Sequence, residues 1–156
     1  MSHSVSVRTN FETGHRLPHL TAERCHNLHG HSWWVDIEVS NRRLDGDGCV
    51  VEFGALKKQV RAWIDSRLDH GLMLGHADPL ADVLPQYGKC FLFGSITPDV
   101  DIEDLEWPTV ENVAVLLARV TTHILDEIGV PDGTFCSRVT VHETAVNTAT
   151  WTQDPR

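Results

Sequence analysis

Apolar and polar residues alternate in two stretches near the start of the chain, with the period of two that is typical of a β-strand. The first stretch runs from Val5 to Arg16, and the second, rich in β-branched and aromatic residues, runs from Ser32 to Ser40. The sequence Asp-Gly-Asp-Gly at 45–48 has the composition of a hairpin turn, and the short apolar run Cys49–Phe53 follows it. We therefore expect two long strands, with residues 49–53 forming the end of a further short strand.

Two later stretches change to the spacing of an amphipathic helix. The first lies between Ala55 and Leu68, and the second begins after Thr109, a residue type that favours the N-cap, and runs to about Ile128. Gly129 stands where a helix C-terminus favours glycine. The apolar stripes that would face the core are Leu56, Val60, Trp63, Ile64 and Leu68 in the first helix, and Val113, Leu116, Leu117, Val120, Ile124 and Ile128 in the second.

The order of the elements predicts the fold class. Strand character returns at Arg138–Val146, so the order is strand, strand, helix, helix, strand. This partial segregation favours an α+β fold, with helices on one face of an antiparallel sheet. Residues 71–107 fit neither periodicity, so we expect an extended irregular connection that is functional or mobile. A chain of 156 residues fits one domain, 1–156.

The charge of the chain bears on its partners. Hydrophobic residues make up 41% of the chain and charged residues 22%, which is typical of a globular protein, and the formal net charge is -9. Because phosphate backbones select basic surfaces, this charge argues against a nucleic-acid partner. It leaves room for a small anion such as a triphosphate, which a few Arg or Lys side chains and backbone amides can hold.

The compartment can also be predicted. No apolar run approaches the ~20 residues that span a bilayer, and the first residues lack the features of a signal peptide. We therefore expect a cytoplasmic protein with no membrane partner.

The cysteines are widely spaced and form no C-x-x-C pair, which argues against a disulfide framework or a zinc ribbon. We expect Cys49, Cys90 and Cys136 to be buried thiols.

The candidate chemistry gathers around three histidines. His29 and His31 are two residues apart on a predicted strand, so both imidazoles can reach one ion, with His15 as a third ligand. Three neutral imidazoles and one open position are typical of catalytic zinc, whereas a structural zinc takes four protein ligands. Cys25 lies nearby, and a thiol beside a cationic centre ionises more easily. The alternative is chance, because ten histidines in 156 residues generate such spacings. We interpret His3, His19, His26, His76, His123 and His142 as surface or structural residues.

The motifs taken together resemble one family. Phe11–Pro18 and the segment Cys25–His31 are similar to the signature of the 6-pyruvoyltetrahydropterin synthase and 6-carboxytetrahydropterin synthase family. The later motifs of that family are matched, in order, by Arg67–His70, Pro108–Asn112 and Val141–Thr144. The resemblance implies the tunnelling fold, in which two helices pack on one face of a four-stranded antiparallel sheet. Three subunits of that fold close their sheets into a barrel, and two trimers stack into a homo-oligomer, a hexamer, with active sites at subunit interfaces.

The same resemblance implies Zn2+ as the cofactor and a pterin triphosphate, 7,8-dihydroneopterin triphosphate, as the small-molecule substrate. Zinc can bind the side-chain hydroxyls of this substrate and stabilise the charge that develops there. A thiolate can remove a carbon-bound proton, and a carboxylate can orient an imidazole that relays protons. The implied roles are zinc binding for His15, His29 and His31, catalysis for Cys25, Asp69 and His70, and substrate binding for Glu143, Thr109, Glu111 and Arg16.

Several of these assignments have alternatives. Glu143 would anchor the pterin by accepting hydrogen bonds from its 2-amino and N3 groups; without the resemblance it would be an exposed strand residue, and Asp69 a surface carboxylate. Arg16 and Lys57 are candidate triphosphate ligands, with ordinary surface charge as the alternative. Glu52 departs from the family, which commonly has aspartate there, and the connection after position 70 is longer than expected.

Members of the family differ in their product. One group releases triphosphate and gives 6-pyruvoyltetrahydropterin. Another also cleaves the side chain, releasing acetaldehyde and giving 6-carboxytetrahydropterin, the route to 7-deazaguanines such as queuosine. A third group has glutamate in place of the cysteine, and Cys25 argues against it. The histidine motifs look closest to the second group, so we expect a lyase, a 6-carboxytetrahydropterin synthase. The alternatives are a 6-pyruvoyltetrahydropterin synthase and a non-catalytic zinc- or pterin-binding paralogue, for which Cys25, Asp69 and His70 would be superfluous.

Overall fold

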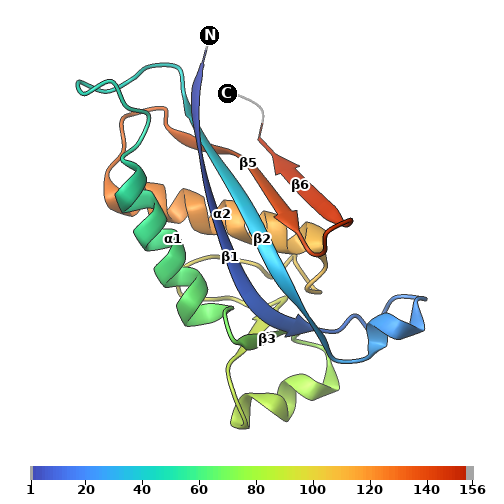
Figure 1. Cartoon of the computed structure of the whole chain (residues 1–156). Coiled ribbons are helices and arrows are strands. Elements are labelled where there is room, and N and C mark those ends of the chain that lie inside the picture. Colours follow the sequence, from blue (N-terminus) through green and yellow to red (C-terminus); the bar gives the residue numbers. More distant parts are fainter. Residues whose placement is uncertain (1, 154–156) are drawn as a thin grey trace.

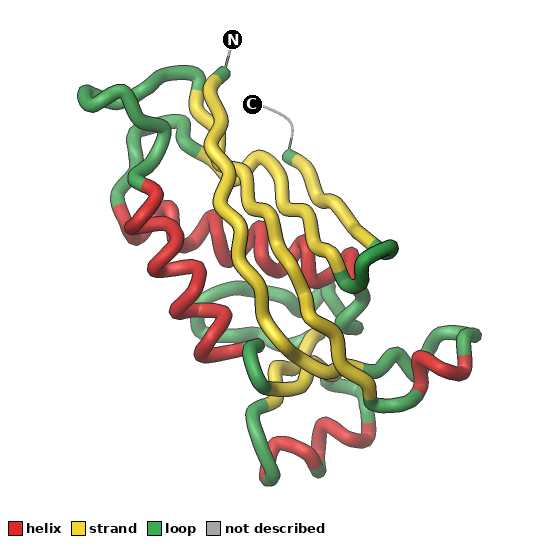
Figure 2. The backbone as a smooth tube through the Cα atoms, viewed as in Figure 1, coloured by secondary structure: helices red, strands yellow, loops and turns green. Residues whose placement is uncertain are grey.

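The computed structural model describes residues 2–153, which form one curved β-sheet with two long helices packed on one face (Figures 1 and 2). The predicted α+β class is confirmed. The elements are β1 (His3–His15), η1 (Glu23–His26), β2 (His29–Asn41), α1 (Phe53–Arg67), β3 (Gly71–Gly75), η2 (Pro79–Asp82), η3 (Leu84–Gln86), β4 (Cys90–Phe93), α2 (Val110–Ile128), β5 (Phe135–His142) and β6 (Thr148–Thr152), where η denotes a short 3-10 helix.

The sheet has six strands in the order β4-β3-β1-β2-β5-β6, rather than the four that were expected. Strands β1, β2, β5 and β6 form the antiparallel part, and β3 and β4 extend it through parallel pairs at the edge of β1. Both extra strands come from residues 71–107, so the prediction of an irregular connection throughout was wrong. Each of the two has five residues or fewer, which is too short for periodicity to distinguish from a loop.

The start of α1 corrects a second prediction, the strand at 49–53. Val50 and Val51 are buried, but they form no strand, and the helix begins at Phe53. Glu52 is the N-cap: its carboxylate oxygens accept hydrogen bonds from the amides of Gly54 and Ala55 at 2.6 and 2.5 Å. These two bonds lower the pKa of Glu52. The residue that departs from the family pattern therefore caps the helix, a role that shorter side chains usually fill.

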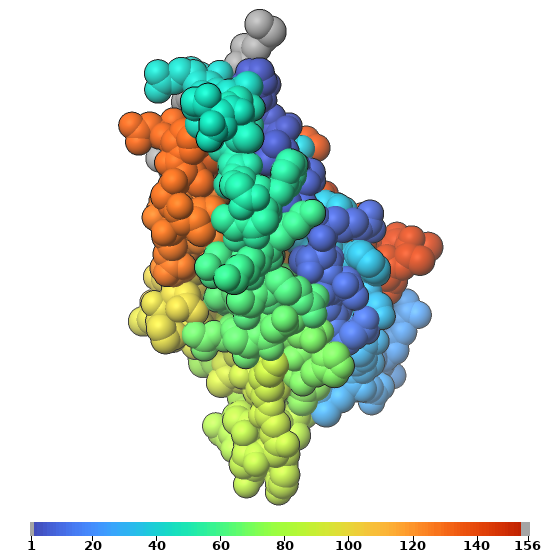
Figure 3. Space-filling model, turned by 60° about the vertical axis from the view of Figure 1, so that its left-hand side comes forward, coloured from blue at the N-terminus to red at the C-terminus, as the bar shows by residue number. Residues whose placement is uncertain are grey.

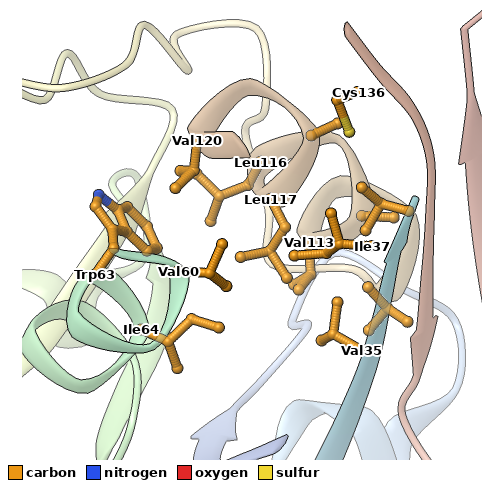
Figure 4. Close-up of a cluster of buried hydrophobic side chains, with 14 of the residues drawn as sticks. Val35, Ile37, Val60, Trp63, Ile64, Val113, Leu116, Leu117, Val120 and Cys136 are labelled. Atoms are coloured by element: carbon orange, nitrogen blue, oxygen red, sulfur yellow. The ribbon is translucent and has the colours of Figure 1, made fainter. Parts of the chain in front are cut away.

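The second helix and the core follow the predicted pattern. Thr109 Oγ1 accepts a hydrogen bond from the amide of Asn112 at 3.2 Å, and Gly129 ends α2 in the left-handed region at φ 69°. The apolar stripes of both helices meet the buried face of β2, as Figure 4 shows. Within residues 2–153, no helix is both long and apolar enough to cross a bilayer. Cys136 is buried as predicted, whereas Cys90 is only half-buried and Cys49 is exposed.

Two connections gather at one end of the sheet. Residues 16–28, between β1 and β2, and residues 76–89, between β3 and β4, leave the sheet at its lower end in Figure 1. In Figure 3 the second connection projects from the body as a lobe. The predicted histidine ligands and Cys25 all lie at this end, because β1 ends and β2 begins there.

Candidate metal centre and active site

The register of β1 and β2 brings the three histidines together. His15 pairs directly with His29, and His31 stands one step further along the same face, opposite Thr13. The three imidazole rings lie 4.6 to 5.2 Å apart between centroids, and one ring nitrogen from each lies within 4.8 Å of the others. This cluster could hold a metal ion.

Backbone carbonyl groups orient two of the imidazoles. Nδ1 of His15 lies 2.9 Å from the carbonyl oxygen of Pro108, and Nδ1 of His29 lies 2.8 Å from that of Asn27. A neutral imidazole that donates from Nδ1 keeps its Nε2 lone pair, so both rings present Nε2 to the cluster. Nε2 of His15 and of His31 are buried without a hydrogen-bond partner within residues 2–153. Buried polar atoms are costly when unpaired, and a metal ion would satisfy both nitrogens.

Burial also keeps His15 and His31 neutral. It lowers the pKa of His15 to about 4, against a smaller upward effect of the Pro108 hydrogen bond and with a further lowering by the two neighbouring histidines. The pKa of His31 is likewise lowered, mainly by burial, although the Glu143 carboxylate opposes the change. A metal ligand must be deprotonated, so these two residues are ready to bind a cation at neutral pH.

Glu143 lies beside the histidine cluster. It follows β5 directly, and its amide donates to the carbonyl oxygen of Asn147 in the turn to β6. Its Oε1 lies 3.5 Å from Nε2 of His15 and 3.8 Å from Nε2 of His31, and its side chain is largely buried. Glu143 is therefore not an exposed strand residue, which was the alternative for this position. A carboxylate at this distance can contact a metal-bound molecule.

Cys25 lies in η1, within the connection between β1 and β2. Its carbonyl oxygen accepts a hydrogen bond from the amide of Leu17 at 2.7 Å, which folds the connection back onto the end of β1. The residue is half-buried, and the part of the chain that the structure describes provides no hydrogen bond to its Sγ. The thiol is thus held on the same connection that leads from His15 to His29.

Asp69 and His70 form a hydrogen-bonded pair at the edge of β1. Asp69 Oδ2 lies 2.7 Å from Nδ1 of His70, and Asp69 Oδ1 accepts from the amide of Glu12 at 2.8 Å. Burial would raise the pKa of Asp69, but its bonds to the Glu12 amide and to His70, together with the charge of Arg61, lower it. Asp69 is therefore an ionised, half-buried carboxylate held by several partners rather than a free surface one. Among residues 2–153, no hydrogen bond or ion pair joins this pair to Cys25 or to the histidine cluster.

The sequence profile of the 6-pyruvoyl tetrahydropterin synthase family matches residues 4–154. The chain belongs to this family. The 6-carboxy-5,6,7,8-tetrahydropterin synthase of Rickettsia felis is 30% identical over 138 residues, which cover 88% of this chain and 91% of that relative. That of Rickettsia bellii is 36% identical over 72 residues, 46% of this chain, and the match spans about half of its length, 51%. The solved structure of Caenorhabditis elegans 6-pyruvoyl tetrahydropterin synthase, 20% identical, shares the fold with a TM-score of 0.63 over 99% of this chain and 97% of that one.

The structure places the other predicted substrate-binding residues in different settings. Nε of Arg16 forms an ion pair of 2.7 Å with Asp78, whose side chain is fully buried. Thr109 caps α2 next to Pro108, the residue that contacts His15, and Glu111 is exposed in the first turn of that helix. Lys57 Nζ lies 5.7 Å from the ring centroid of Phe53, on the exposed surface of α1. Substrate binding by these residues stays a prediction.

Three residues near the site had no signal in the sequence. Asp78 holds Arg16 and also accepts from the amide of Leu80 at the start of η2. The ring of Trp107 stacks on that of His19, with 4.6 Å between centroids, and so joins the connection that carries Cys25 to the segment before α2. Lys89 contacts the turn that carries Asp69, donating from Nζ to the carbonyl oxygen of Asp69. Apart from the local bond between Asp78 and Leu80, these contacts join residues far apart in the chain, so only the folded structure reveals them.

Proposed function

We propose that this protein is a zinc-dependent 6-carboxy-5,6,7,8-tetrahydropterin synthase, which converts 7,8-dihydroneopterin triphosphate to 6-carboxytetrahydropterin, acetaldehyde and triphosphate. The observation that carries the proposal is the convergence of three histidines beside the carboxylate of Glu143. Two of these histidines have buried nitrogens with no hydrogen-bond partner among residues 2–153. The name of the Rickettsia felis relative, 30% identical over most of both chains, supports this product.

The donor set fits zinc. Three imidazole nitrogens without a thiolate are the ligands of a catalytic zinc site, which keeps a fourth position open for a substrate or water. His15, His29 and His31 would hold the ion. When bound, zinc makes the side-chain hydroxyls of the substrate more acidic and stabilises the negative charge that develops on their oxygens.

Glu143 would hold the pterin ring. A carboxylate can accept two hydrogen bonds from the 2-amino and N3 groups of a pterin, which selects this edge of the ring. Because Glu143 lies beside His15 and His31, a ring anchored there would direct its side chain towards the metal centre. This proximity supports the assignment of Glu143 as the pterin anchor.

Cys25, Asp69 and His70 would move the protons. The Cys25 thiolate would remove a proton from a side-chain carbon of the substrate, as a general base does. Asp69 accepts from Nδ1 of His70 and so leaves Nε2 of that ring to exchange a proton with a substrate oxygen. A non-catalytic binding protein would need neither the thiol nor this pair.

We infer that the protein acts as a homo-oligomer, a hexamer formed from two trimers. The outer strands β4 and β6 leave sheet edges, and exposed edges are usually covered or paired. Joining three sheets into a barrel would cover edges and could bring the Asp69–His70 pair of one subunit to the metal centre of another. The cytoplasmic location, the single domain and the absence of nucleic-acid and membrane partners stay predictions from the sequence.

The test is incubation of the zinc-loaded protein with 7,8-dihydroneopterin triphosphate, followed by mass analysis of the pterin and an assay for acetaldehyde. We expect 6-carboxytetrahydropterin with one acetaldehyde per turnover. Release of triphosphate with a 6-pyruvoyltetrahydropterin product would assign the other branch of the family. An unchanged substrate in the presence of bound zinc would overturn the proposal and favour the binding paralogue.

A further inference from the structure

Lys89 connects the lobe between β3 and β4 to the end of α1. Its backbone carbonyl accepts from the amide of Leu72, which starts the pairing of the two strands. Its side chain reaches back to the helix, where Nζ donates to the carbonyl oxygens of Asp65 and Asp69, each at 2.6 Å. A β-carbon at Gly71 would lie 3.1 Å from Cδ of Lys89, so the aliphatic stem passes close over this glycine.

The end of α1 leaves these carbonyl groups in need of a donor. The amides of Leu68 and Asp69 both bond to the carbonyl oxygen of Ile64, so the next carbonyl, that of Asp65, receives no amide in the regular helical pattern. A cation at a helix C-terminus also interacts favourably with the helix dipole. The ammonium of Lys89 supplies both the donor and the charge.

The second acceptor, the carbonyl oxygen of Asp69, belongs to the peptide group that joins Asp69 to His70. The amide of that same peptide group, on His70, donates to the carbonyl oxygen of Glu12 at 2.7 Å. Lys89 and β1 thus hold one peptide plane from its two sides. The plane needs this support because His70 has φ 55°, a left-handed conformation that is unfavourable for a residue with a side chain.

We propose that Lys89 is a positioning residue for proton transfer. Its ammonium fixes the Asp69–His70 peptide plane, and this sets the direction in which the imidazole of His70 is presented. The inference rests on the proposed function, because it takes Asp69 and His70 as the proton-transfer pair. The side chain of His70 is 81% exposed, so packing does little to orient it, and its direction depends on the bond to Asp69 and on the backbone of the turn.

The test uses three variants of the full chain. Lys89→Met keeps the stem but removes the donor, and Lys89→Arg keeps a cation that can donate to two carbonyls. Lys58→Met removes an exposed lysine from the first half of α1, away from the end that Lys89 binds. Four quantities are measured on each: kcat, KM, zinc content, and the exchange rate of the His70 amide proton by NMR. Amide exchange reports on the turn without any turnover.

We expect Lys89→Met to lower kcat by about tenfold to a hundredfold, part of the ~10²–10⁴ that an acid–base group contributes. KM and zinc content should stay within about twofold, because no hydrogen bond among residues 2–153 joins Lys89 to Glu143 or to the three clustered histidines. The His70 amide should exchange faster. Lys89→Arg should restore most of kcat, and Lys58→Met should match the wild type.

The inference would be overturned by unchanged kcat and exchange in Lys89→Met, or by a loss of kcat that Lys89→Arg does not restore. A loss of zinc in step with kcat would also contradict it, since Lys89 would then act on overall structure. If the wild type itself does not turn over, the proposed function fails, and the amide exchange alone decides whether Lys89 holds the turn.

Discussion

Nδ1 of His15 lies 2.9 Å from the carbonyl oxygen of Pro108, although 93 residues separate the two in the chain. This contact joins the end of β1 to the residue before the N-cap of α2. It also fixes which nitrogen of His15 carries the proton, so that Nε2 points into the histidine cluster. The histidine cluster is therefore oriented by the packing of α2 as well as by the strands that carry its members.

Removing one histidine should abolish metal binding. We expect the wild type to contain about one zinc per subunit and His29→Ala to lose it, because two remaining imidazoles bind zinc much more weakly. Elemental analysis of the purified protein measures the content. His123→Ala, which changes a histidine exposed on α2 and paired with Glu127, is the matched control and should keep its zinc. Full zinc content in His29→Ala would rule out the three-histidine site.

The stability of the metal-free protein should fall as the pH is lowered from 6.5 to 4. Burial lowers the pKa of His15 from 6.5 to about 4, so within this range the unfolded chain binds a proton that the folded chain does not. Stability is then greatest above pH 6.5 and is lost towards pH 4, by roughly 3 kcal/mol for this residue. Denaturant unfolding at several pH values measures the slope. His15→Asn should flatten it, and an equal slope in that variant would contradict the assignment.

Cys25→Ala should separate catalysis from binding. The variant should retain zinc and bind the pterin, because its thiol is not among the clustered ligand atoms, yet kcat should fall by about 10²–10⁴ as expected for a lost general base. Zinc content and turnover are measured on one preparation. Cys49→Ala, which changes an exposed cysteine, should behave as wild type. Near-normal turnover by Cys25→Ala would refute the catalytic role, and loss of zinc would make Cys25 a ligand.

The long elements and the histidine cluster could be predicted because their signals are local. His29 and His31 are two residues apart, so they lie on the same face of a strand. The pairing of that strand with the first one then brings His15 next to them. The helices carry apolar stripes over several turns, so each helix can be predicted even when its ends are placed wrongly by one or two residues.

The rest could not be predicted, because its signals are short or non-local. Strand β4 has four residues and pairs in parallel with β3, so no hairpin turn marks it. Val50 and Val51 are apolar because they enter the core beside the start of α1, a pattern that resembles a strand end. The contacts of Pro108, Lys89 and Asp78 each depend on the position of an element that the local pattern does not specify.

Arg16 should matter for stability. Replacing it with methionine would leave the carboxylate of Asp78 fully buried without its ion-pair partner, and we expect the free energy of unfolding to fall by about 3 kcal/mol. Urea unfolding measures the change, with Arg24→Met, an exposed arginine in the same connection, as the control. Unchanged stability would show that the pair contributes little. A rise in KM for the triphosphate substrate would add the predicted binding role to this structural one.

The protein should be a hexamer in solution. Strands β4 and β6 end the sheet on its two sides, and assembly into a barrel of three sheets would cover such edges. Assembly would also bring the Asp69–His70 pair to the metal centre of a neighbouring subunit. Within the described chain, this pair makes no contact with Cys25 of its own subunit. Light scattering should give about six times the chain mass of 17.5 kDa, close to 105 kDa, with activity in that species.

Mixing inactive Cys25→Ala and inactive His70→Ala subunits tests the sharing of sites directly. Mixed hexamers should recover part of the activity, because some sites would combine an intact thiol with an intact imidazole from a neighbour. An active monomer, or mixed hexamers without activity, would contradict the shared site.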